Sequence, residues 1–140
     1  IKVGRNCNLD YPSVLAVQDT REFEKNGNRQ KQPSLIMEPG SNLSGMVLYM
    51  EESDSGGYGA NIQIYETAHV YGEIYCKGSL ELKGNVSGSV TTRSFIAMEK
   101  GNVYQNHLFG GNIDVNLLPE TYGGLVLKDE PANQVMEWLY

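Results

Sequence analysis

The sequence predicts an all-β fold, a single-stranded parallel β-helix of about five to six coils. Short runs of alternating apolar and polar residues indicate strands, and these runs come in pairs separated by Gly or Asn. The pairs also repeat: the step is about 16 residues from Val70 to Val86 and about 17 from Val86 to Val103, which is the length of one coil. Sixteen glycines suit the many tight turns that such a fold needs.

The chain begins with a more degenerate coil, in which Ile1, Val3, Leu9 and Tyr11 keep the spacing of the first apolar positions of later coils. The coil from 34 to 48 matches a later one position for position. The equivalent residues are Leu35, Met37, Leu43, Gly45 and Val47 in one coil and Ile62, Ile64, Val70, Gly72 and Ile74 in the next.

Two polar segments interrupt the period, at 18–33 and 51–60. They cannot bury enough apolar surface to belong to the core, so we expect both to leave the coils as exposed loops. The whole chain, 1–140, is then one domain, long enough to bury a core of its own.

Stacked coils bring equivalent side chains into continuous inward columns. We predict one column from Leu35, Ile62, Leu80 and Ile96, with Ile113 as a fifth candidate, and a second from Leu43, Val70, Val86 and Val103. The glycines Gly45, Gly72 and Gly88 lie between inward positions, where the wall must bend or the lumen has no room for a side chain.

The pattern fades after Ile113, and Pro131 is followed by apolar residues at helical spacing. Because the open end of a solenoid exposes strand edges and core, we expect 129–140 to form a short capping helix that lays Trp138 over the last coil.

Composition excludes several classes of partner. The net charge is −6 and the basic residues are scattered except near Lys25, Arg29 and Lys31, which disfavours nucleic acid. The sequence has no apolar stretch of membrane-spanning length, so we expect contact with a membrane only through a segment upstream of Ile1.

Two cysteines, Cys7 and Cys76, are too few for a disulfide scaffold and lack the spacing of metal ligands. We interpret them as inward core thiols, with a Cys7–Cys76 disulfide as the alternative. We predict no cofactor and no metal site. The Gly-rich run 56–61 resembles one calcium-binding nonapeptide, but that motif binds in tandem and occurs here once.

Candidate ligand-binding residues are Tyr71, Glu73 and Tyr104, whose side chains we expect on the outer wall, where tyrosine rings can stack on a sugar. Exposed strand tyrosines are the alternative reading. Paired carboxylates do not repeat along this wall as glycoside hydrolysis requires, and we predict no catalytic residues.

The two histidines, His69 and His107, raise the alternative of a hexapeptide-type acyltransferase, in which one histidine is a general base. In that class a small residue directly follows the aliphatic one three times per coil, whereas here Gly is two positions on and recurs once. Surface or hydrogen-bonded histidines are the interpretation we prefer.

The spacing of apolar residues and glycines from Ile62 to Val90 resembles that of the bactofilins, polymer-forming cytoskeletal proteins. The resemblance covers about 34–115. It implies a right-handed, triangular β-helix and a scaffolding role through end-to-end stacking of coils, with no catalytic residues. The two polar loops and the expected C-terminal cap depart from the bactofilin pattern.

A second resemblance, to uncharacterised bacterial envelope proteins, rests on the run Tyr11–Leu15 and on the coils at Gly72–Tyr75 and Gly101–Tyr104. It implies a domain of the cell envelope, with a cytoplasmic scaffold as the alternative. The resulting hypothesis is a non-enzymatic structural or surface-display domain that associates with itself or with other envelope proteins. A carbohydrate-binding or carbohydrate-processing β-helix is the alternative.

Overall fold

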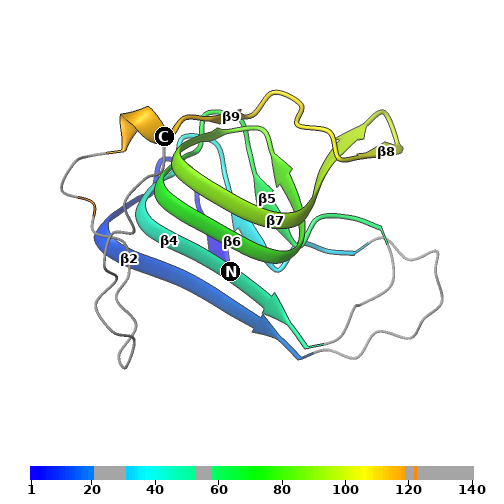
Figure 1. Cartoon of the computed structure of the whole chain (residues 1–140), viewed down its shortest axis with the longest axis horizontal. Helices are drawn as coiled ribbons and strands as arrows, with labels where there is room; N and C mark the ends of the chain where they lie inside the picture. The colour runs from blue at the N-terminus through cyan, green and yellow to red at the C-terminus, as the bar shows by residue number, and fades with distance from the viewer. Residues whose placement is uncertain (21–30, 53–57, 119–121, 123–140) are drawn as a thin grey trace, which may run out of the picture.

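A computed structural model describes residues 1–20, 31–52, 58–118 and 122 of the chain. Its strands form one curled sheet with the shape of a half-barrel (Figure 1). The strands are β1 (Lys2–Val3), β2 (Asn8–Asp19), β3 (Leu35–Met37), β4 (Asn42–Glu51), β5 (Ile62–Ile64), β6 (His69–Leu82), β7 (Asn85–Glu99), β8 (Asn102–Gln105) and β9 (Asn112–Ile113). The predicted all-β class is confirmed.

Strand pairing is parallel throughout except between β7 and β8. The order is β1-β3-β5-β6-β4-β2, and β7 pairs with the far side of β6. The first part of β6 pairs with β4 and its last part with β5. Strand β6 therefore joins the strands β1, β3 and β5 to the strands β2 and β4, and the sheet curls around its interior (Figure 1).

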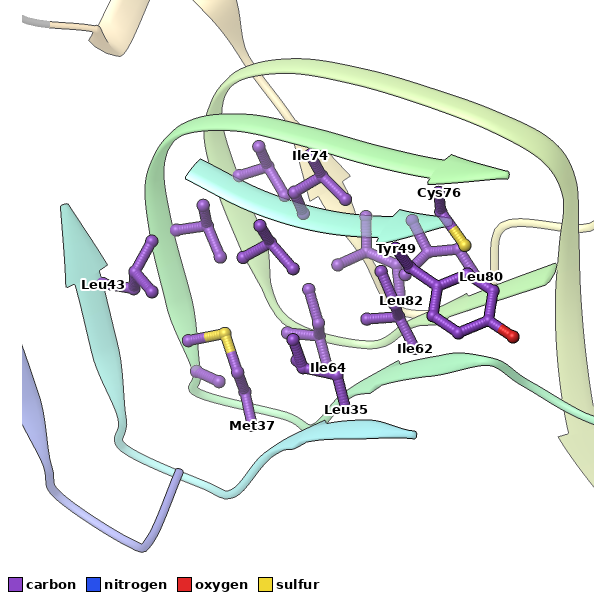
Figure 2. Packing of buried hydrophobic residues seen from close by; sticks show 14 of the residues in the cluster. Leu35, Met37, Leu43, Tyr49, Ile62, Ile64, Ile74, Cys76, Leu80 and Leu82 are labelled. Carbon is purple, nitrogen blue, oxygen red and sulfur yellow. The ribbon is translucent and has the colours of Figure 1, made fainter. Parts of the chain in front are cut away.

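Equivalent side chains stack in columns inside the curl (Figure 2). One column consists of Leu9, Leu43, Val70, Val86 and Ile113, which are in register from β2 to β9. A second consists of Leu35, Ile62, Leu80 and Phe95. Most of these side chains are fully buried, and each such burial stabilises the fold by about 1.5–3 kcal/mol. The position-for-position alignment of the coils at 34–48 and 62–74 is therefore confirmed.

The predicted place of Val103 in the column of Leu43, Val70 and Val86 is wrong. Val103 lies opposite Met98 in an antiparallel hairpin, and Ile113 takes the place next to Val86. The reversal comes at Lys100 and Gly101, which both have positive φ, as a two-residue hairpin turn requires. Ile96 is displaced from the column of Leu35, Ile62 and Leu80 by a register shift between β6 and β7 after Cys76, which places Phe95 beside Leu80 instead.

The first coil is less regular than the sequence predicts. Val3 and Leu9 pair as expected, with Met37 and Leu43. Tyr11 does not, because the register shifts between Leu9 and Ser13 and it is Ser13 that lies beside Gly45.

The predicted capping helix at 129–140, including Trp138, lies outside the described residues. Within the described part of the chain the helical element is a single 3-10 turn, Val115–Leu117. Strands β2 and β4 extend to Asp19 and Glu51, into the first residues of the segments predicted as loops.

Gly45, Gly72 and Gly88 are in register on three neighbouring strands and form what we call the glycine ladder. Their φ angles are +144°, +144° and +149°, a conformation that residues with a Cβ avoid. A Cβ on Gly72 would overlap the carbonyl oxygen of Gly45, and one on Gly88 would overlap that of Gly72. The close approach of neighbouring backbones, rather than a crowded lumen, therefore requires glycine here.

Replacing Gly72 with alanine tests this requirement. We expect Gly72→Ala to lower the free energy of unfolding by at least about 2 kcal/mol, because it adds both backbone strain and overlap with a carbonyl oxygen. Chemical denaturation measures the change. The control is Gly4→Ala, where a Cβ would meet no atom within 4 Å and we expect a change within about 0.5 kcal/mol. Equal midpoints for the two variants would contradict the account.

Candidate functional site

The three predicted ligand-binding residues lie in different surroundings. Tyr71 stacks on His69, with ring centroids 3.9 Å apart and an interplanar angle of 12°. Glu73 is half-buried near Tyr122, whose pKa is raised by burial and then by the charge of Glu73. Tyr104 is exposed on β8. None of the contacts among the described residues joins the three into one platform.

His69 forms a hydrogen bond with a serine on the neighbouring strand. Its Nε2 atom lies 2.8 Å from Oγ of Ser87, the distance expected for a base and a nucleophile. Ser87, however, is only 1% exposed, so a substrate cannot reach its hydroxyl. Burial lowers the pKa of His69 and favours the neutral imidazole. We therefore interpret the pair as a structural contact, in agreement with the preferred interpretation of His69 as a hydrogen-bonded histidine.

Both cysteines are free. Cys76 is buried in the core, as predicted. Cys7 is half-buried and packs against the core cluster. Burial raises the pKa of the Cys76 thiol to about 12. That thiol is consequently protonated at neutral pH and is a poor nucleophile.

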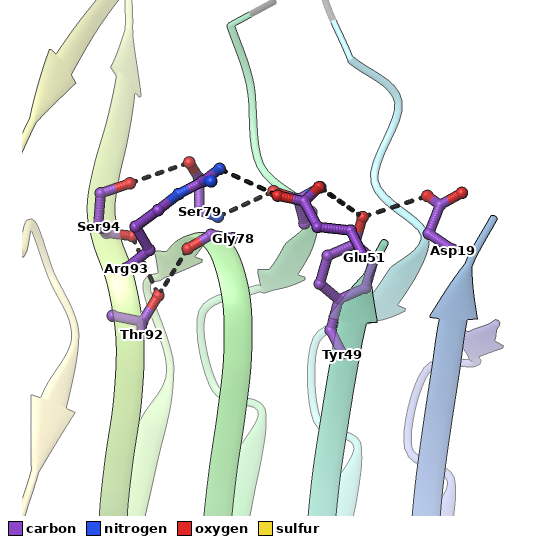
Figure 3. Close-up of polar contacts among 9 residues, drawn as sticks. Asp19, Tyr49, Glu51, Gly78, Ser79, Thr92, Arg93 and Ser94 are labelled. Carbon is purple, nitrogen blue, oxygen red and sulfur yellow. Dashed lines mark hydrogen bonds and ion pairs between the residues drawn. The ribbon is translucent and has the colours of Figure 1, made fainter. Parts of the chain in front are cut away.

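The interior also contains a polar cluster that the sequence analysis did not find (Figure 3). It begins with Tyr49, the largest fully buried side chain among the described residues, whose hydroxyl lies 3.2 Å from Oδ2 of Asp19 and 3.3 Å from Oε2 of Glu51. The hydroxyl also accepts a hydrogen bond of 2.7 Å from Nδ2 of Asn61. One phenolic proton is thus shared by two carboxylates, and burial together with these charges raises the pKa of Tyr49.

Further polar groups complete the cluster. Nη2 of Arg93 lies 3.1 Å from Oε1 of Glu51, and the hydroxyl of Ser34 donates to Asp19. Asn61 accepts a hydrogen bond of 2.8 Å from the backbone N–H of Ser79. The cluster therefore ties together the ends of β2 and β4, the start of β5 and the bend in β6. Because its members satisfy one another, its chemistry is structural.

A simple signal in the sequence could have revealed this cluster. In β4 the inward positions follow a period of two through Leu43, Gly45 and Val47, and the same period places Tyr49 and Glu51 inside. Because 51–60 is predicted to be a loop, the predicted inward pattern stops short of Glu51. An acidic residue at an inward position needs partners, which here are Tyr49 and Arg93.

The described residues contain no group of three or more His, Cys, Asp or Glu side chains that could hold a metal ion. In the same part of the chain, no helix has the length and apolar character needed to cross a membrane. The predicted Gly-rich run 56–61 is described only from 58 onward. Its Asn61, which stands where the calcium-binding motif has Asp, is the buried bridge to Ser79.

The open edge of the sheet is the other candidate site. The pairing order ends at β1 and at β2, and β2 is the longer of these two strands; among the described residues its only partner is β4. Its centre, Ser13–Gln18, carries no charge, and Val14 is 46% exposed. Long edge strands without charges are sites of pairing with another chain.

Comparison with known proteins adds no assignment. No family model, no curated protein and no solved structure matches the chain.

The polar cluster makes a testable contribution to stability. We expect Tyr49→Phe to lower the free energy of unfolding by about 1–3 kcal/mol, because Asn61 and two carboxylates each lose a buried partner. The control is Tyr75→Phe at a tyrosine that is 37% exposed, with an expected change within about 0.5 kcal/mol. Denaturation with urea compares the two. Similar stabilities would show that the hydroxyl of Tyr49 does not support the fold.

Proposed function

We propose that the chain is a non-enzymatic structural domain that associates with a second copy of itself through the β2 edge. The observation that supports this proposal is the open edge, 12 residues long and parallel to its one partner. No strand of the described part of the chain bonds the backbone groups on its far side, and its uncharged centre presents no repulsion to an approaching strand.

The two ends of the sheet differ in a way that favours pairing of like edges. At the other end, β9 pairs with the start of β7 and β8 with its last residues, so both cover parts of that edge (Figure 1). End-to-end stacking of β2 on β7 would meet these two strands. Among the described residues, no such strand covers the β2 edge. Two β2 edges related by a twofold axis can therefore pair, and such a contact closes into a dimer.

The interior supports a structural role as well. The apolar columns, the glycine ladder and the polar cluster each join several strands, and all of them serve to hold neighbouring strands in register. The proposal also takes the curled sheet to be part of the right-handed parallel β-helix that the sequence predicts. In the dimer, backbone hydrogen bonds would continue from the β2 strand of one copy to that of the other.

The proposal includes a location at the bacterial cell envelope. This part, like the kinship with bactofilins, rests on the sequence resemblances alone. Fractionation of cells that produce the native protein tests the location.

Charges placed on the β2 edge test the association. We expect the wild-type domain to form dimers in a concentration-dependent manner, and Val14→Lys with Ala16→Lys to weaken the dimer at least about tenfold, because like charges would face each other across the twofold axis. Analytical ultracentrifugation over a range of concentrations measures both.

The matched control is Thr91→Lys. Thr91 is exposed and occupies the ladder position of Ala16 on β7, three strands away, so we expect this variant to dimerise like the wild type. A wild-type domain that stays monomeric, or an edge variant that dimerises normally, would refute the proposal.

A further inference from the structure

The hairpin of β7 and β8 builds a rigid wall beside the main sheet. Its pairs run from Glu99 and Asn102 next to the turn to Ile96 and Gln105 at the far end. The two turn residues have φ values of +50° and +82°, which suit a tight turn between antiparallel strands. Strand pairing therefore fixes the backbone positions of the residues on this hairpin relative to one another.

The chain then folds back along the hairpin. Asn106 has a φ of +57°, and its backbone N–H donates a hydrogen bond of 2.7 Å to the carbonyl of Phe95. This turn brings His107 beside Tyr104, with ring centroids 6.3 Å apart at an angle of 51°. Phe109 follows two residues later.

Together these segments line an open hollow of about 370 Å³, within the range of small-molecule sites, about 300–1,000 Å³. Tyr104 and Phe109 line it with rings that are 48% and 56% exposed. Polar groups of Glu99, Asn102 and His107 line it as well, together with the ammonium of Lys100. All of the lining residues belong to the described part of the chain.

This lining selects a ligand with two kinds of surface. Aromatic rings favour a flat apolar face of a ligand, such as the C–H face of a pyranose. The residues around these rings offer hydrogen-bonding groups. The carboxylate, amide and imidazole suit hydroxyl groups that both donate and accept. The lining contains one acidic residue, Glu99, and one basic residue, Lys100, so its formal charges cancel and favour a neutral ligand. Glu99 also forms an ion pair with Lys83, whose Nζ lies 3.9 Å from Oε1 of Glu99.

We propose that this hollow binds a neutral saccharide, with a sugar ring stacked on Tyr104 and Phe109 and its hydroxyl groups bonded to Glu99 and Asn102. Of the three residues expected from the sequence to bind carbohydrate, only Tyr104 takes part. The site is independent of the β2 edge, since it is built from β7, β8 and the segment that follows them.

A glycan array identifies neutral glycans that bind the domain, and calorimetry with cellohexaose and chitohexaose measures affinity directly. We expect Tyr104→Ala to weaken binding at least about tenfold, because it removes the stacking surface. Phe109→Ala should have a similar effect, and Tyr104→Phe, which keeps the ring, should bind like the wild type. All three changes are at exposed positions, and circular dichroism verifies that the variants fold.

The matched control is Tyr75→Ala, at an exposed tyrosine on β6 outside the hollow, which should leave affinity unchanged. The proposal is overturned if no neutral glycan binds, or if a bound glycan is insensitive to Tyr104→Ala. A displayed peptide library tests for a protein partner instead. If an apolar peptide binds the domain, loses that binding in Phe109→Ala, and no glycan binds, the hollow is a site for a protein partner and the proposal is also overturned.

Discussion

The close approach of neighbouring strands at the glycine ladder constrains the rest of the structure. Each ladder glycine lies against the carbonyl oxygen of the strand before it, at a φ that side-chain-bearing residues avoid. Only one register of β4, β6 and β7 brings Gly45, Gly72 and Gly88 together. Since a shift by one residue would turn every inward side chain outward, the ladder and the apolar columns depend on the same register.

The polar cluster applies a second constraint at one end of the interior. A tyrosine and two carboxylates enter a region that is otherwise apolar, and they are tolerated because Asn61, Ser34 and Arg93 provide partners. A buried charge without its partners would destabilise any other arrangement of these strand ends. The columns of leucine, isoleucine and valine alone would permit neighbouring strands to slide past one another. The cluster thus adds specificity for one register at this end of the interior.

The parts of the fold that depend on periodicity could be predicted from the sequence, since the inward positions of the coils at 34–48 and 62–74 match position for position. The parts that depend on local exceptions could not. Val103 has the spacing of a column residue, but the turn at Lys100 and Gly101 reverses the chain before it. The polar cluster was missed because Glu51 looks like the first residue of an acidic loop, and the hollow beside Tyr104 forms only once Asn106 turns the chain back.

The register of the glycine ladder is the central claim, and nuclear Overhauser effects between neighbouring strands test it most directly. In a ¹³C- and ¹⁵N-labelled sample, the account predicts contacts from the backbone protons of Gly72 to those of both Gly45 and Gly88, and side-chain contacts between Val86 and Ile113. Contacts between Val86 and Val103 would contradict this register. So would contacts from Gly72 to the neighbours of Gly45 and Gly88 in the sequence without contacts to these two glycines themselves.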